Sequence, residues 1–248
     1  MLAKIKYSML AVAAVLMLGF KPTVSHAVPA LQLDIEGGSY DFTTETIVAN
    51  SDPFTLYAFL STNNYNLLSD SFYLSVAVLP SLEYDPAGFD LGSFSLNGTS
   101  YNVTSDMYYG TPPVEEYYNT FDGGDLAPHG VFPTYFYEHE FQFDGNDTTA
   151  RYNTQDRAIT GTIDTENGLM YYVSFSIDTT RLASDYVLHF DLYNTKVKRG
   201  GDIDISMFAP FSHDAESSRK VPEPGTLILL GSGLVGFYVH GRMRKKRS

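Results

Sequence analysis

The chain has no cysteine and no tryptophan among its 248 residues. The absence of cysteine excludes disulfides, thiolate metal sites and a cysteine nucleophile. A protein of this composition must be held together by buried apolar surface or by bound ions. Hydrophobic residues make up 44% of the chain, with 19 tyrosines and 17 phenylalanines, which is enough for the core of one ordinary domain.

Basic residues are scarce and unevenly placed. The net charge of the whole chain is −13; residues 1–27 contribute +3 and residues 221–248 contribute +4, which leaves −20 on residues 28–220. A surface this negative repels the phosphate backbone, so we expect no nucleic-acid partner. The two basic ends belong to segments that handle membranes.

Residues 1–27 have the parts of a secretory signal peptide. Lys4 and Lys6 form a positive start, an apolar stretch covers 9–20, and Ser25-His26-Ala27 places small residues where signal peptidase reads them. We therefore predict a signal helix and cleavage by signal peptidase between Ala27 and Val28. The alternative is a permanent anchor, but the apolar stretch is shorter than the roughly 20 residues that span a bilayer.

Residues 221–248 also have three parts in order. Val221-Pro222-Glu223-Pro224-Gly225 comes first, an apolar segment covers 226–239, and a basic cluster covers 242–247. An apolar segment followed by positive charge predicts a single membrane helix with its basic end in the cytoplasm. The prolines keep the preceding backbone extended, as a processing enzyme requires.

This arrangement resembles the PEP-CTERM sorting signal, in which a Pro-Glu-Pro triplet precedes a membrane segment and an arginine-rich end. The resemblance implies an exosortase, a membrane enzyme that recognises the motif and cleaves near it, in bacteria that make exopolysaccharide. By the same resemblance Val221, Pro222, Glu223 and Pro224 are recognition residues. We expect an inner-membrane intermediate that is then delivered to the cell surface or the extracellular space. A plain single-pass anchor is the alternative, although it would need no such triplet.

The body between these ends is predicted to be all-β. Period-2 alternation with aromatic and β-branched residues predicts strands over 54–60, 72–79, 94–96, 101–103, 135–143, 170–177, 186–193 and 203–208. Asn97-Gly98 between two of these is a strong hairpin signal. We predict an antiparallel β-sandwich over 28–211, jelly-roll-like. Residues 108–133 are expected to form a long loop, and the polar residues 212–220 a linker.

Four stretches of the body resemble a family of exported domains called choice-of-anchor N, whose members carry different C-terminal surface signals. The stretches are residues 31–38, 129–135, 189–194 and 208–215. The family has no assigned biochemical function, so the resemblance implies a location and no chemistry.

The usual sequence patterns of an enzyme are missing from the body. It contains no Gly-x-Ser-x-Gly elbow, and its histidines are far apart with no His-Glu-x-x-His pair. Glu138-His139-Glu140 is the most suggestive triplet. On a strand, however, the two glutamates point away from the histidine, so we expect them on the solvent face and His139 among aromatic residues. We therefore expect no catalytic activity.

Three kinds of binding remain open. A zinc site assembled from distant strands has no spacing signature but stays an alternative, and the histidines of the body are His129, His139, His189 and His213. Oxygen-rich clusters in loops suit calcium, and the candidate ligands are Asp144, Asn146, Asp147, Asp202 and Asp204. Tyrosines of the expected long loop could stack on sugar rings, or pack that loop onto the sandwich; they are Tyr108, Tyr109, Tyr117 and Tyr118.

We therefore expect a non-catalytic surface or matrix protein associated with exopolysaccharide. A carbohydrate-binding module is the first alternative. A secreted glycoside hydrolase is the second, and it needs two carboxylates facing one another across a cleft.

Overall fold

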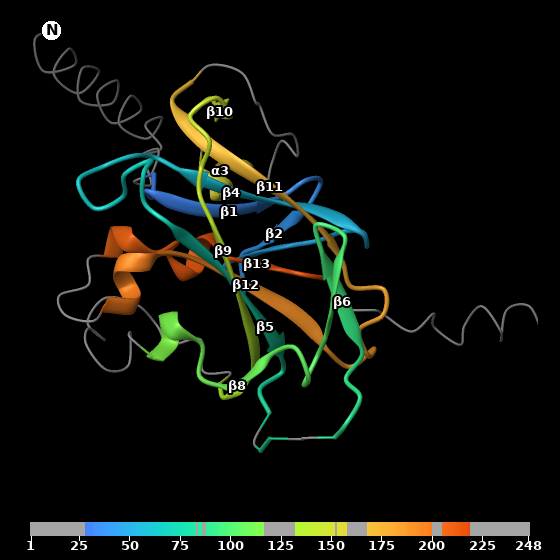
Figure 1. The fold of residues 1–248 in the computed structure, drawn as a ribbon. Coiled ribbons are helices and arrows are strands. Elements are labelled where there is room, and N and C mark those ends of the chain that lie inside the picture. Colours follow the sequence, from blue (N-terminus) through green and yellow to red (C-terminus); the bar gives the residue numbers. More distant parts are fainter. Residues whose placement is uncertain are drawn as a thin grey trace, which may run out of the picture.

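The computed structural model describes residues 28–82, 84–85, 88–116, 132–151, 153–157, 168–199 and 205–218. Within this part of the chain two β-sheets pack face to face around one main core (Figure 1). The two ends, for which a signal helix and a membrane helix were predicted, lie outside the described residues. The all-β sandwich is confirmed, and its jelly-roll-like connectivity stays a prediction.

The first sheet is antiparallel throughout. Its strands, in spatial order, are β1 (Leu31–Ile35), β4 (Phe54–Leu60), β11 (Met170–Asp178), β6 (Ser93–Leu96) and β7 (Thr99–Asn102), with β10 (Thr148–Thr149) beside β11. Asn97 and Gly98 join β6 to β7 with φ angles of 51° and 79°. Positive φ at both central residues is what a two-residue hairpin of type I′ requires, so the predicted hairpin is confirmed.

The second sheet is also antiparallel apart from one pair. Its order is β2 (Ser39–Asp41), β3 (Thr46–Val48), β13 (Ala215–Glu216), β12 (Val187–Asn194), β5 (Phe72–Leu79), β9 (Thr134–Phe141) and β8 (Tyr108–Gly110). β13 runs parallel to β3 and antiparallel to β12. The short helices are α3 (Thr154–Arg157), η1 (Thr195–Arg199), η2 (Ile205–Met207) and η3 (Phe211–His213).

β12 is buried along its whole length because both of its faces are covered. One face contributes to the core between the sheets through Leu188, Phe190 and Leu192. Since side chains alternate along a strand, His189, Asp191 and Tyr193 lie on the other face of the second sheet, here called the outer face. Part of that face is covered by a second apolar cluster, made of Val114, Tyr193, Val197, Phe208 and Phe211. Polar residues on β12 are therefore enclosed.

The predicted inward alternation of two strands is confirmed. Along β9 the inward residues are Tyr135, Tyr137, His139 and Phe141, and along β11 they are Tyr171, Val173, Phe175 and Ile177. The strand predictions for 54–60 and 72–79 coincide with β4 and β5.

Two predictions near the C-terminal end of the body are wrong. The strand expected over 203–208 is a 3-10 helix at Ile205–Met207, and Phe208 forms an isolated bridge with Tyr193. The linker expected over 212–220 is part of the fold as far as residue 217. His213, Asp214, Ala215 and Ser217 are all buried. The error has a physical cause: these residues are mostly polar, and their backbone pairs with the neighbouring strands β3 and β12, which sequence polarity does not reveal.

Candidate functional site

Several of the predicted site residues lie outside the described part of the chain. These are Ala27, Asp202, Asp204 and the sorting residues 221–224. Val28 is the first described residue. The cleavage site and the sorting contacts therefore stay predictions.

The loop expected to bind calcium forms a tight exposed turn. One carboxylate oxygen of Asp144 accepts hydrogen bonds from both the backbone N–H of Asn146, at 2.9 Å, and its side-chain amide, at 2.8 Å. The backbone N–H of Asp147 donates to the Asp144 carbonyl at 3.3 Å. These bonds are those of an ordinary Asx turn. Calcium binding at Asp144, Asn146 and Asp147 stays a prediction.

The triplet Glu138-His139-Glu140 is divided between the two faces of β9, as its alternation predicted. Glu138 accepts a hydrogen bond from the Tyr193 hydroxyl and pairs with Lys198 at 2.9 Å. Glu140 accepts from the Tyr73 hydroxyl at 3.1 Å. His139 points inward, with its ring edge-on to Phe175 at 5.8 Å. The histidine therefore does not act together with the two glutamates.

We expect His139 to make the stability of the fold depend on pH. Partial burial lowers the pKa of His139 below its ordinary value, so the folded state favours the neutral ring. The contribution is complete above the unfolded pKa of about 6.5 and is lost as pH falls below that value toward the folded pKa. Melting temperatures measured from pH 7.5 to 5.5 should fall less steeply for His139→Leu than for the wild type. Equal slopes would contradict this expectation.

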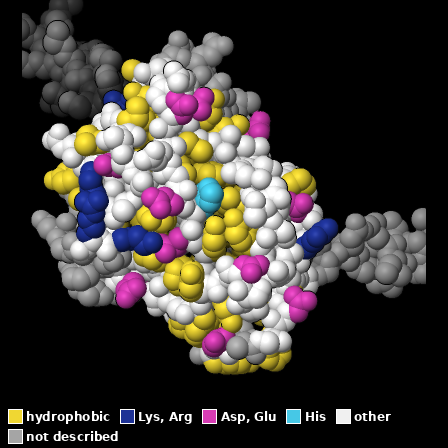
Figure 2. Space-filling view, in the orientation of Figure 1, with side chains coloured by type: hydrophobic (Ala, Val, Ile, Leu, Met, Phe, Trp, Pro, Cys, Tyr) yellow, Lys and Arg dark blue, Asp and Glu magenta, His cyan; other side chains and the backbone are white. Residues whose placement is uncertain are grey.

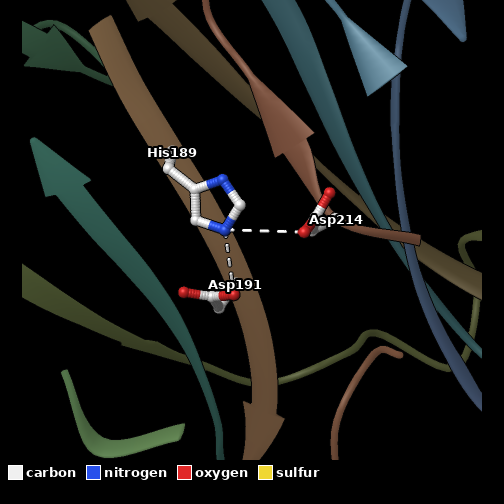
Figure 3. Close-up of side chains that lie close together, drawn as sticks. All are labelled: His189, Asp191 and Asp214. Atoms are coloured by element: carbon white, nitrogen blue, oxygen red, sulfur yellow. Dashed lines mark hydrogen bonds and ion pairs between the residues drawn. The ribbon is translucent and has the colours of Figure 1, made fainter. Parts of the chain in front are cut away.

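Three buried side chains of the outer face come together (Figure 3). His189 and Asp191 are two apart on β12, so they point to the same side. Asp214 immediately precedes β13, and the register His189↔Glu216 and Phe190↔Ala215 continues to place it across from Asp191. The exposed fractions of His189, Asp191 and Asp214 are 4%, 4% and 1%. Within the described residues this is the one group of three His, Asp or Glu side chains near enough to share a metal ion.

Both carboxylates approach the same ring nitrogen. His189 Nε2 lies 3.2 Å from Asp191 Oδ1 and 3.5 Å from Asp214 Oδ2. The arrangement can act as an ion pair between a protonated ring and the carboxylates, or as a ligand set for a cation. A zinc site assembled from distant strands was left open by the sequence, but its residues were not identified because no spacing signature marks them. The available signal was His-x-Asp on a strand that is apolar at every other position.

Ser75 lies beside this group on the outer face. It is directly opposite Asp191 in the pairing of β5 with β12. Its side chain is fully buried, and its hydroxyl oxygen has no hydrogen-bond partner. Directly opposed residues point to the same face with Cβ atoms about 5 Å apart. Ser75 therefore places an uncommitted hydroxyl next to the Asp191 carboxylate.

The nearby His213 is held by a separate set of contacts. Its Nε2 lies 2.7 Å from the side-chain oxygen of Asn153, and its Nδ1 lies 2.8 Å from the Ser212 hydroxyl. With both ring nitrogens engaged, His213 fits a role in joining η3 to the residues just before α3.

The described surface offers scattered acidic and aromatic groups. Figure 2 shows acidic side chains spread singly over one face, among hydrophobic ones. Tyr109 packs against Tyr135 and donates a hydrogen bond to the Leu82 carbonyl, which confirms the packing role expected for the loop tyrosines at this position. Tyr108 is 72% exposed, whereas Tyr117 and Tyr118 lie outside the described residues. The loop expected from residue 108 is a strand over Tyr108–Gly110, and Tyr108 on this strand is the described tyrosine of the four that could meet a sugar.

Comparison with known proteins identifies one segment. Residues 220–245 match the PEP-CTERM protein-sorting motif, which marks the chain as exported through the membrane and sorted by exosortase to the cell surface. No curated protein and no solved structure matches the chain. Among the described residues, no helix is long and apolar enough to cross a membrane.

Proposed function

We propose that the protein is a non-catalytic surface or matrix component associated with exopolysaccharide. After removal of the signal peptide it passes through an inner-membrane intermediate held by residues 226–239, and exosortase then releases it. The sorting motif at 220–245 carries this proposal. The sandwich supports it, because its last strand ends at Glu216, just before the motif begins. Exosortase can thus act on a segment that follows a completed domain.

The body is proposed to contact polysaccharide through its acidic surface and bridging cations. Residues 28–220 carry a net charge of −20, since the two ends hold +7 of the total of −13. Cations that bind both this surface and acidic sugars would link the two without a cleft. The resemblance to choice-of-anchor N domains belongs to this proposal and rests on the four sequence stretches named above. A carbohydrate-binding module remains the second candidate because Tyr108 is exposed.

Replacing Pro222, Glu223 and Pro224 with alanine should stop processing, because exosortase would no longer recognise the segment. We expect the variant to accumulate uncleaved in the inner membrane, while the wild type is recovered with the extracellular polysaccharide. Fractionation of a host that has an exosortase, followed by mass determination of the protein in each fraction, measures both.

Tyr84→Ala provides the matched control, since Tyr84 is 69% exposed on the body and far in sequence from the motif. It should be processed and released as the wild type is. Normal processing of the triple alanine variant would contradict the sorting assignment. A cleaved wild type that is absent from the polysaccharide fraction would instead leave sorting intact and remove the matrix role.

A further inference from the structure

We propose that His189, Asp191 and Asp214 form a binding site for a divalent cation of the zinc class. The site lies on the outer face of the second sheet, where β12 meets the segment that enters β13. It is separate from the predicted calcium loop at 144–147, and it does not depend on the matrix role.

The first argument is geometric. A protonated imidazole has a single N–H bond at Nε2, which cannot point along a straight line to two different oxygens. Here two carboxylate oxygens surround that one nitrogen at 3.2 and 3.5 Å. Ligands about 2.0–2.1 Å from a tetrahedral zinc ion lie about 3.3–3.4 Å from one another. These two nitrogen–oxygen separations match two edges of a zinc coordination tetrahedron, and the three ligand atoms all lie within 4.8 Å of one another.

The second argument is the charge and type of the donors. A neutral imidazole and two carboxylates carry a total charge of −2, which a divalent ion neutralises in surroundings where charge is expensive to bury. Calcium prefers six to eight oxygen ligands, whereas imidazole with carboxylate suits zinc and the neighbouring transition metals. All three side chains are at least 95% buried, so they form a compact site with few ligands.

The third argument is Ser75. Its buried hydroxyl oxygen has no hydrogen-bond partner, and the residue lies directly across from Asp191. Such a group is costly unless something completes its hydrogen bonding. Beside a metal it can donate to the ligating Asp191 carboxylate or hold a metal-bound water. Groups that hydrogen-bond to metal ligands in this way orient them and raise affinity.

The site would fasten the C-terminal end of the body to its centre. Asp191 belongs to β12, and Asp214 lies at the entry to β13, directly before the segment that leads to the sorting motif at residue 220. A metal bound by both strands adds its binding free energy to folding, because the unfolded chain does not hold these ligands together. Loss of metal would loosen the strand that connects the sandwich to its sorting signal.

The test uses the full chain purified in detergent, stripped with a chelator and titrated with Zn²⁺, Mn²⁺ or Ca²⁺. We expect about one Zn²⁺ per chain, and at roughly 100 times the dissociation constant a rise in melting temperature of about 5–10 °C. Asp191→Asn and Asp214→Asn keep the side-chain shape and should lose most of the bound metal. Asp144→Asn, in the exposed turn, should bind zinc as the wild type does.

A second measurement avoids the risk that a variant fails to fold. Cobalt(II) in place of zinc should give the visible absorption of a tetrahedral site with nitrogen and oxygen ligands in the wild type. A folded wild type that binds neither zinc nor cobalt stoichiometrically would overturn the proposal. The three residues would then be explained as an ion pair between His189 and the two carboxylates. Full binding by both asparagine variants, or calcium binding in preference to zinc, would also overturn the proposal.

Discussion

A chain that spans residues 28–211 will be unfolded or far less stable than one that spans 28–218, which will fold. The seven additional residues include β13, which lies inside the second sheet between β3 and β12. The backbone N–H groups of Ile47 and Ala49 donate to the carbonyls of Asp214 and Glu216, and the N–H of Leu188 donates to the Ser217 hydroxyl. Truncation leaves these three buried donors unpaired, at about 1–3 kcal/mol each. Their sum is comparable to the whole stability of a typical domain.

Urea unfolding followed by circular dichroism measures the difference. The longer chain should show one cooperative transition, and the shorter chain should show none or one shifted to much lower urea. Removing β13 also separates β2 and β3 from the rest of the sheet, so the loss extends beyond the deleted residues. Equal midpoints for the two chains would mean that β13 contributes little, and would restore the view of residues 212–217 as a linker.

The sequence predicted the strands whose burial follows from their own composition. β4 and β5 are mostly apolar and aromatic over seven and eight residues, and β11 and β12 were found within one residue of their bounds. β13 has two residues, Ala215 and Glu216, and no pattern of its own. It is a strand only because two longer strands leave a gap that its backbone fills. Such a strand depends on long-range pairing, which local propensity cannot show.

The candidate metal site was beyond sequence reasoning for a related reason. His189 and Asp191 are on the face of β12 opposite Phe190, and the alternation of that strand was visible. The sequence did not show that these two side chains are buried, because the outer face is covered by segments that no sequence pattern assigned to it. Asp214 is 23 residues further along the chain than Asp191, and only the pairing of β13 with β12 brings the two carboxylates to one nitrogen.

We expect Gly92→Ala to destabilise the protein far more than Gly98→Ala. Both glycines have a positive φ, 86° and 79°, so either substitution imposes the strain of a left-handed backbone, about 1–2 kcal/mol. A Cβ on Gly98 meets nothing within 4 Å. A Cβ on Gly92 would lie 2.8 Å from the backbone nitrogen of Ala183 and 2.9 Å from Cα of Leu182, and it would overlap the Arg181 carbonyl oxygen. These are backbone atoms, which cannot move aside by changing a rotamer.

The clash falls where three connections meet. Gly92 bridges Leu182, Ser93 N–H donates to the Arg181 carbonyl at 3.1 Å, and Ala183 N–H donates to the Leu91 carbonyl at 3.0 Å. Making room for a methyl group must break some of these bonds, at about 1 kcal/mol each, in addition to the strain. Denaturant unfolding of the two variants should therefore give a loss for Gly92→Ala at least twice that for Gly98→Ala. Equal losses of stability would show that backbone strain alone accounts for both variants. The turn after β11 would then move to make room for the methyl group at little cost.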